Sequence, residues 1–300
     1  MSASLFWSTV CARKCRLVAP ARLRAVSTRP IPAVLSIAGS DSGGGAGIQA
    51  DLKAFARCGV HGMTAITAIT AQNTVGVEAV AAVSGEMIIA QIAAVSEDIG
   101  IDAVKVGMLG SAETIEGVVA ALALVVDGDP PVVVDPVMIS ESGAVLLEPD
   151  ARETLIVRML PMATVVTPNI PEARELTGLG EGASQEDLAR QVFALGPQAV
   201  VVTGGHSEEL VDLFYDGEQL VEIPGERHPG GAAHGSGCTH SSALAAFLAR
   251  GAEPLQAAAA ARKVAAVAVG AGLRDLGKGP GPVDVFELTS RANEEPDLPR

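Results

Sequence analysis

The sequence predicts an α/β protein built on a mostly parallel, doubly wound sheet, and three observations support this prediction. From residue 33 onward, short apolar runs alternate with helical patterns, as in chains whose strands and helices follow one another along a parallel sheet. The apolar runs are continuous, as expected for strands that are buried on both faces. A hairpin followed by two long helices then interrupts the repeat, which favours an open sheet over a closed barrel.

Six apolar runs are predicted as strands, at 33–38, 63–70, 103–106, 131–135, 164–167 and 199–203. Helical periodicity fills the intervals, at 46–58, 86–98, 112–126, 150–160, 170–177 and 185–195. Runs at 211–215 and 219–223 flank Asp216-Gly217-Glu218 and predict the hairpin. Helices near 241–250 and 255–272 complete a single domain over residues 31–290, and we expect a flexible tail at 291–300.

Residues 1–30 differ from the rest of the chain. They contain six basic side chains and no acid, and they show neither helical nor strand periodicity. We expect a disordered basic extension. It is either a transit peptide or a stretch upstream of a true start near Val26.

The charge and the cysteines exclude several classes of protein. The net charge is −14, of which residues 1–30 contribute +6, so the remainder carries −20. Such an acidic body argues against nucleic-acid binding. The cysteines, at positions 11, 15, 58 and 238, show no metal-binding or disulfide spacing, which suits a reducing cytosol. No uncharged apolar run reaches membrane length, so we expect no membrane partner.

Residues 234–240, His-Gly-Ser-Gly-Cys-Thr-His, form a glycine turn that leads into an alanine-rich helical run. The amides of Gly235, Ser236 and Gly237 would point at one spot, where the helix dipole favours an anion or a phosphoryl group. The same field would lower the pKa of Cys238, making it a thiolate near neutral pH. This interpretation predicts phosphoryl transfer; the alternative is a capped helix with a small residue packed at its start.

A second glycine loop, residues 40–47, follows the first predicted strand and opens a helix. Gly45-x-Gly47-x-x-Ala50 matches a relaxed dinucleotide fingerprint, but residues 63–71 lack the acid that would hold a ribose, so we reject dinucleotide binding. We expect the loop to bring backbone close to a small ligand, with a tight turn as the alternative. Asp51 would face that ligand or stabilise the helix N-terminus.

A third glycine-rich stretch, residues 272–278, has Walker A spacing. However, Gly279 stands where Ser or Thr must bind magnesium, and no strand precedes the stretch, so it is not a P-loop. Lys278 would reach a phosphate or be a solvated loop lysine, and the two interpretations are equally good.

Carboxylates and an amide gather after two neighbouring predicted strands. Asn169 and Glu172 lie on one face of a helix start, and Asp135 ends the preceding strand. Such oxygens suit a hydrated Mg²⁺, which prefers few protein ligands and many waters. A capping arrangement is the alternative for Asn169 and Glu172.

Eight segments complete the set of motifs. They are 34–51, Ala71-Gln-Asn-Thr74, Lys105-Val-Gly-Met-Leu109, Asp135-Pro-Val-Met138, Thr167-Pro-Asn-Ile-Pro-Glu172, Gly204-Gly-His206, 234–239 and 277–283. In this order, and spanning residues 33–285, they resemble the hydroxymethylpyrimidine/phosphomethylpyrimidine kinases, the thiamine-pathway family of the ribokinase superfamily. The resemblance implies a ribokinase-like, three-layer α/β/α sandwich with its site at one edge of the sheet.

The resemblance also implies an activity, cofactors and partners. The activity is ATP-dependent phosphorylation of 4-amino-5-hydroxymethyl-2-methylpyrimidine and then of its monophosphate, with ATP and Mg²⁺ as cofactors. The only partners expected are the small pyrimidine substrate and a second copy of the chain in a homodimer. The location implied is cytoplasmic, or organellar if residues 1–30 are a transit peptide. Two alternatives remain, a pyridoxal kinase and a catalytically silent pyrimidine-binding homologue, although intact Asp135, Glu172 and Cys238 argue against silence.

Carried over residue by residue, the resemblance assigns roles to residues of this chain. Gln72 would bind the aminopyrimidine, in a pocket also lined by Gly39, Asp51, Met108 and Val137. Cys238 would stand where sugar-kinase relatives use an aspartate as general base. Magnesium would be held, through water, by Asp135, Asn169 and Glu172. The nucleotide phosphates would contact Gly235, Ser236, Gly237, Lys278 and Thr203, the last of which replaces a lysine frequent in the family.

Overall fold

The computed structural model describes residues 29–292, except 125, 127, 142, 206–209 and 230. The expectations for the extension and for the tail therefore lie almost wholly outside the described residues, as does His206. Arg29, which we assigned to the extension, is described and forms a 3.0 Å ion pair with Asp102 of the body.

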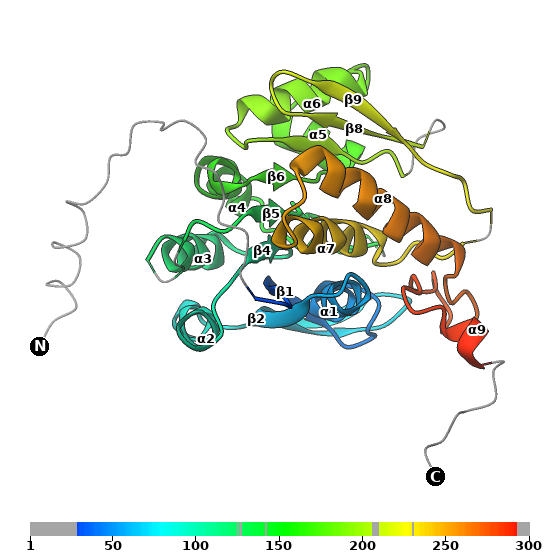
Figure 1. The fold of residues 1–300 in the computed structure, drawn as a ribbon, viewed down its shortest axis with the longest axis horizontal. Helices are drawn as coiled ribbons and strands as arrows, with labels where there is room; N and C mark the ends of the chain where they lie inside the picture. The colour runs from blue at the N-terminus through cyan, green and yellow to red at the C-terminus, as the bar shows by residue number, and fades with distance from the viewer. Residues whose placement is uncertain are drawn as a thin grey trace, which may run out of the picture.

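The sheet is open, as predicted (Figure 1). In the described part of the chain it has nine strands, one more than predicted. Its order is β3-β2-β1-β4-β5-β6-β7-β8-β9, in which β2, β1, β4, β5, β6 and β7 run parallel and the remaining pairs are antiparallel. The strands span Ala33–Asp41 (β1), His61–Gln72 (β2), Val77–Ala82 (β3), Ala103–Val106 (β4), Val132–Val134 (β5), Val165–Val166 (β6), Val200–Val202 (β7), Val211–Tyr215 (β8) and Leu220–Pro224 (β9).

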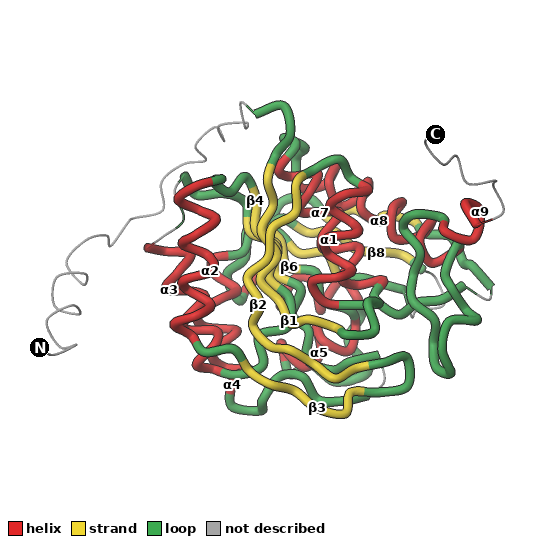
Figure 2. The backbone as a smooth tube through the Cα atoms, turned by 90° about the horizontal axis from the view of Figure 1, so that it is seen from below, coloured by secondary structure: helices red, strands yellow, loops and turns green. Residues whose placement is uncertain are grey.

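Helices cover both faces of this sheet, which gives the predicted three layers (Figures 1 and 2). One face packs against α1 (Gly47–Arg57), α7 (Ser236–Ala249) and α8 (Pro254–Gly270). The other packs against α2 (Gly85–Asp98), α3 (Ala112–Leu124), α4 (Ala151–Thr154), α5 (Ile170–Thr177) and α6 (Gln185–Ala194). Successive strand residues point to opposite faces, so Val34 lies in the first core and Leu35 in the second.

Three features differ from the sequence prediction. Strand β3 and the short helix α9 (Leu288–Ala292) were not predicted. β3 is exposed along almost its whole length, so it leaves no burial pattern in the sequence. The helix predicted at 150–160 changes after Thr154 into a π-helical turn, Leu155–Met159, and a 3₁₀ turn, Leu160–Met162. Pro161 lies in the 3₁₀ turn and cannot donate a backbone hydrogen bond, which explains the change of winding.

Helix α7 begins at Ser236, so Cys238 lies in its first turn. Among the described residues, no helix is both long and apolar enough to cross a bilayer.

Candidate active site

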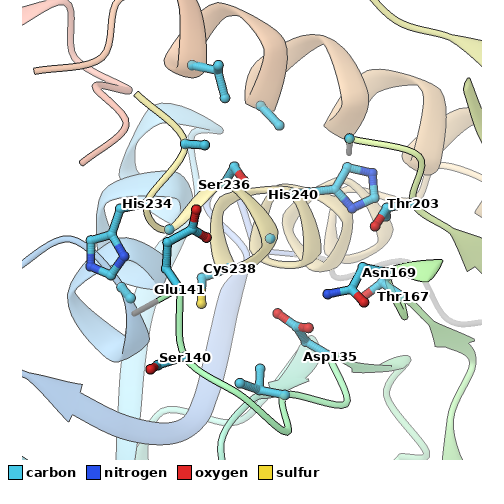
Figure 3. Close-up of a pocket in the computed structure, with 18 of the residues that line it drawn as sticks. Asp135, Ser140, Glu141, Thr167, Asn169, Thr203, His234, Ser236, Cys238 and His240 are labelled. Atoms are coloured by element: carbon cyan, nitrogen blue, oxygen red, sulfur yellow. The ribbon is translucent and has the colours of Figure 1, made fainter. Parts of the chain in front are cut away.

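A cavity of about 390 Å³ lies at the carboxyl ends of the parallel strands. Each central strand contributes a lining residue just beyond its end or at its last positions: Gly39 from β1, Met108 after β4, Asp135 after β5, Thr167 after β6 and Thr203 after β7. The start of α7 closes the cavity from the other side, with Cys238 at its centre (Figure 3). Ligands of open α/β sheets bind at this edge because all the parallel strands present their carboxyl ends there.

The turn before α7 is held open by glycine. Gly235 caps the helix with φ +82°, and a side chain there would overlap the carbonyl oxygen of Gly45, so the two glycine loops touch through bare backbone. The amide of Ser236 donates to the oxygen of Ala233 at 2.9 Å, so it is engaged within the turn. Gly235, Ser236 and Gly237 all line the cavity, but the engaged amide of Ser236 departs from the expectation that all three amides point at one spot.

An ionisable pair fastens the two glycine loops together. Asp41 accepts hydrogen bonds from the amides of Gly43, Gly45 and Ala46, and its Oδ2 lies 3.3 Å from Nε2 of His234. Burial alone would raise the pKa of Asp41, but the hydrogen bonds from His234 and from the amides outweigh it and lower the pKa. The charged carboxylate of Asp41 therefore organises the glycine loop 40–47, which forms part of the cavity wall.

The environment of Cys238 contradicts the expectation of a thiolate near neutral pH. Burial raises the pKa of this thiol to about 12, and the charges of Asp135 and Asp51 add to the rise. The field of Lys105 and a hydrogen bond from the Gly47 backbone act in the opposite direction but do not compensate. Desolvation of the thiol therefore outweighs the effect that the start of a helix has on a cysteine pKa.

Beneath Cys238 lies a buried cluster of charges. The Nζ atom of Lys105 is 3.0 Å from Oδ1 of Asp51 and 4.0 Å from Oδ2 of Asp135, and the side chains of Lys105 and Asp51 are 0% exposed. Ser36 and Ser242 donate to Asp51 at 2.6 and 2.7 Å. Burial opposes the charge of Lys105, but Asp51, Cys238 and Asp135 outweigh it and raise its pKa, so the lysine stays protonated.

Two carboxylates, Asp135 and Glu172, influence each other beside this cluster. Glu172 and the amide side chain of Asn169 form a capping box at the start of α5, so the capping interpretation is confirmed. Both residues nevertheless line the cavity. Burial and the charge of Asp135 raise the pKa of Glu172 to about 8, and burial also raises the pKa of Asp135. Two desolvated carboxylates that repel each other favour a cation between them.

Most of the predicted site residues line the cavity. The lining includes Gly39, Gln72, Met108, Val137, Asp135, Asn169, Glu172, Thr203, Gly235, Ser236, Gly237 and Cys238. Two predictions were wrong about position. Asp51 does not line the cavity, because its side of α1 turns inward to Lys105. Lys278 does not line it either; its side chain is exposed, and its backbone amide bonds to Thr74 in the β2–β3 turn.

The loop that contains Lys278 connects two motifs that are distant in the sequence, 71–74 and 277–283. Thr74 accepts hydrogen bonds from the amides of Lys278 and Gly279, at 3.1 and 3.2 Å. A side chain at Gly277 or Gly279 would overlap Thr74, so both positions require glycine. The segment 277–283 and Thr74 therefore support the site structurally, and Gln72 is the member of its motif that reaches the cavity.

Sequence reasoning missed several lining residues. Lys105 and His234 occur inside quoted motifs, and a lysine within an apolar strand is a signal that could have been used. Asp212, His240 and Arg262 also line the cavity, but they come from three separate elements with no common motif.

The site thus combines the parts of a small-molecule phosphotransferase: a helix start open to an anion, a thiol beside it, and paired carboxylates. Comparisons with known proteins agree with this class. The sequence pattern of the family described as phosphomethylpyrimidine kinase matches residues 41–284. A hydroxymethylpyrimidine/phosphomethylpyrimidine kinase of Rhizobium meliloti is 48% identical over 258 residues, which are 84% of this chain and 96% of that protein.

Solved structures of small-molecule kinases are also similar to this chain. A phosphomethylpyrimidine kinase from Clostridium difficile is similar over 77% of this chain and 96% of that chain, with 44% identity and a TM-score of 0.68. The ADP complex of Bacillus subtilis pyridoxal kinase is similar over 86% of this chain and 99% of that chain, with 38% identity and a TM-score of 0.78. The chain belongs to the phosphomethylpyrimidine kinase family.

Proposed function

We propose that this protein phosphorylates 4-amino-5-hydroxymethyl-2-methylpyrimidine with ATP, and then phosphorylates the resulting monophosphate to the diphosphate, in thiamine biosynthesis. One observation supports this most: a single cavity is lined by the start of α7, the thiol of Cys238 and the side chain of Gln72. Relatives at high coverage are named for both phosphorylations. A related kinase was solved with ADP, which supports a nucleotide as phosphoryl donor.

Gln72 is proposed to read the aminopyrimidine. It is the last residue of β2, and its backbone is fixed by Ser42, whose hydroxyl accepts from the Gln72 amide at 2.8 Å. Thr70 donates to its side-chain oxygen at 3.2 Å, which orients the carboxamide. A carboxamide offers both a donor and an acceptor, as an aminopyrimidine edge does.

The phosphoryl transfer needs positioning and charge neutralisation more than covalent chemistry. We propose that the amides at the start of α7 stabilise the migrating γ-phosphoryl group and that Cys238 accepts the proton of the substrate hydroxyl. Only the thiolate can accept this proton, so Cys238 must first lose its own proton to solvent. With a pKa of about 12 the thiolate is a minor form near neutral pH, and the positive field of Lys105 favours it. The thiolate then becomes the neutral thiol as the substrate oxygen forms its bond to phosphorus. No covalent enzyme intermediate is required.

We propose Mg²⁺ as a cation held near the carboxylates of Asp135 and Glu172. Asp135, Glu172 and Asn169 offer oxygens from two elements. Burial raises the pKa of both carboxylates, and the charge of Lys105 offsets this only in part at Asp135, so an added cation would stabilise their charged forms. No group of three or more His, Cys, Asp or Glu side chains among the described residues has metal-binding geometry, so the contact would run largely through water. Such an ion would neutralise charge on the phosphate oxygens of ATP.

The function is tested by ATP consumption with purified protein, supplied in parallel with hydroxymethylpyrimidine, its monophosphate and pyridoxal. We expect turnover with both pyrimidines and its loss in EDTA. Turnover confined to pyridoxal would make the protein a pyridoxal kinase, which the likeness to such kinases makes a real alternative. Pyrimidine binding without turnover would mean a silent homologue, and both results would overturn the proposal.

Gln72→Leu is expected to raise the KM for the pyrimidine by at least about tenfold, because the ring's polar groups would be left unpaired. The KM for ATP should stay nearly unchanged. Steady-state kinetics with each substrate varied in turn measure both constants. Gln219→Leu, in the exposed β8–β9 turn, is the control and should change neither. An equal loss of affinity for both substrates would contradict the role given to Gln72.

We propose that two copies of the chain form a homodimer through the β3 edge. Among the residues that the structure describes, no strand pairs with the outer side of β3, which lies at the rim away from the helical layers (Figure 2). Its side chains include Val80, which is 51% exposed and lies opposite Thr70 of β2. An uncovered apolar edge strand readily pairs with another strand.

Val80→Lys is therefore expected to convert the dimer to a monomer, because each copy would place a charge in the interface. Sedimentation at micromolar concentration measures this. Val267→Lys is a matched control, since Val267 is also 51% exposed but lies on α8. A wild-type monomer, or equal effects of the two variants, would exclude the β3 interface.

We also propose a cytoplasmic location. Cys58 and Cys238 are both free thiols, and a thiol at the centre of the site needs reducing surroundings.

A further inference from the structure

Three charged or titratable side chains meet at the end of the cavity beside Thr203. Asp212 comes from β8, His240 from α7 and Arg262 from α8, and all three line the cavity. Oδ1 of Asp212 is 3.3 Å from Nη1 of Arg262, and Oδ2 is 3.6 Å from Nε2 of His240. Figure 3 shows His240 next to Thr203, with Asn169 and Asp135 nearby, and across Cys238 from His234.

The polar atoms of this cluster are incompletely satisfied. The side chains of His240 and Asp212 are 5% and 0% exposed, yet both ring nitrogens of His240 and Oδ2 of Asp212 have no hydrogen-bond partner. The other oxygen of Asp212 accepts from the amide of Gly204 at 2.9 Å, and Arg262 donates to the oxygen of Leu210 at 2.7 Å. Buried polar groups are rarely left unpaired unless something else completes them.

The charge balance indicates what completes this cluster. Asp212 and Arg262 cancel each other, so protonation of His240 would leave a net positive charge at the cavity wall. Burial lowers the pKa of His240 and Arg262 lowers it further, against the opposing charge of Asp212, so the ring is neutral while the cavity is empty. An anion in the cavity would supply the missing countercharge.

The two residues predicted to contact the nucleotide phosphates beside the helix start supply no cation here, because Thr203 is uncharged and Lys278 lies outside the cavity. Arg227 and Glu226 also line the cavity, with opposite charges. Asp135, which follows β5, and Glu172 of α5 would be occupied by the proposed metal ion. The charges that act on the pKa of His240 are those of Asp212 on β8 and Arg262 on α8. A further histidine, His228, also lines the cavity.

We propose that His240 takes up a proton from solvent when the phosphate chain of a nucleoside polyphosphate occupies this end of the cavity, and that the resulting imidazolium, supported by Asp212, strengthens nucleotide binding. The proposal rests on the proposed function, because it assigns the phosphate-binding charge of the same site. In the bound state, Nε2–H faces the Asp212 carboxylate and the added charge acts on the phosphates across the low-dielectric cavity. Nucleotide affinity should then depend on pH.

Isothermal titration calorimetry with ADP in EDTA tests this without turnover and without metal. Titrations at pH 7.5 in two buffers of different ionisation enthalpy give the number of protons taken up per ADP. His240→Gln, which cannot titrate, should reduce this number by at least about half a proton relative to wild type and weaken ADP binding. Protons bound by ADP itself or by Glu172 occur in both proteins, so the difference isolates His240.

A pH series gives a second measure. For each unit of pH, the Kd of the wild type for ADP should rise by up to about tenfold more than the Kd of His240→Gln. The limit is about tenfold because one linked proton changes the slope of log Kd against pH by at most one. His240→Phe, which keeps a ring without a titrating group, should match the glutamine variant. His61→Gln removes an exposed histidine away from the cavity and should behave as wild type.

An unchanged proton count and ADP affinity in both His240 variants would overturn the proposal and leave a purely structural cluster, whose loss would lower only the melting temperature. This failure is distinct from failure of the proposed function. If the proposed function were wrong, the wild-type protein would consume no ATP with any pyrimidine, whatever the state of His240.

Discussion

Cys238→Ala is expected to lower kcat by about 10²–10⁴-fold, the usual cost of removing a general base. The KM for ATP should change little, because the amides at the start of α7 remain in place. Steady-state kinetics with hydroxymethylpyrimidine measure both constants. Cys58→Ala is the matched control, because Cys58 is the other free thiol of the described residues and is buried away from the cavity. A near-normal kcat for Cys238→Ala would reduce the cysteine to a packing residue at a helix start.

Two further measurements separate a proton acceptor from a packing residue. Cys238→Asp should recover part of the activity, because a carboxylate also accepts a proton. Iodoacetamide should inactivate the free enzyme at a rate that rises about tenfold per pH unit from pH 7 to 9, because a thiol with a pKa of about 12 is still far from fully ionised there. Substrate should protect. An inactivation rate that does not change between pH 7 and 9 would instead support a thiolate with a low pKa, which the structure contradicts.

Lys105→Met is expected to lower the free energy of unfolding by about 3–5 kcal/mol, because it leaves buried carboxylates without their countercharge. Lys105 is the cation between Asp51 and Asp135, at 3.0 and 4.0 Å, in a place where its own side chain is 0% exposed. Urea denaturation measures the loss. Lys278→Met, in an exposed loop, is the control and should stay within about 0.5 kcal/mol of wild type.

The double variant Lys105→Met/Asp51→Asn tests the cause of this loss. If the uncompensated charge is responsible, neutralising Asp51 should recover at least about 1 kcal/mol relative to the sum of the two single variants. Strict additivity of the two losses would show that Lys105 acts through its volume alone. Ser36 donates to Oδ2 of Asp51 and Ser242 to Oδ1, so with asparagine one serine keeps its acceptor and the hydroxyl of the other can accept from the amide NH2.

The sequence alone determined the order and type of most elements. Continuous apolar runs predicted the parallel strands because strands that are covered on both faces have no polar side. The pairing of Asn169 with Glu172 at a helix start, and the place of Cys238 at the mouth of α7, also follow from local spacing. These features depend on residues a few positions apart, which the chain specifies without its tertiary neighbours.

Only the tertiary structure decided what depends on distant neighbours. The rotation of α1 against the sheet turned Asp51 toward Lys105 and away from the cavity, and the loops around Cys238 raised its pKa where the helix dipole alone would lower it. β3 forms only because β2 lies beside it, and the His240–Asp212 cluster joins elements whose residues share no motif. Desolvation and charge pairing act through space, so their outcome is fixed only when the packing is known.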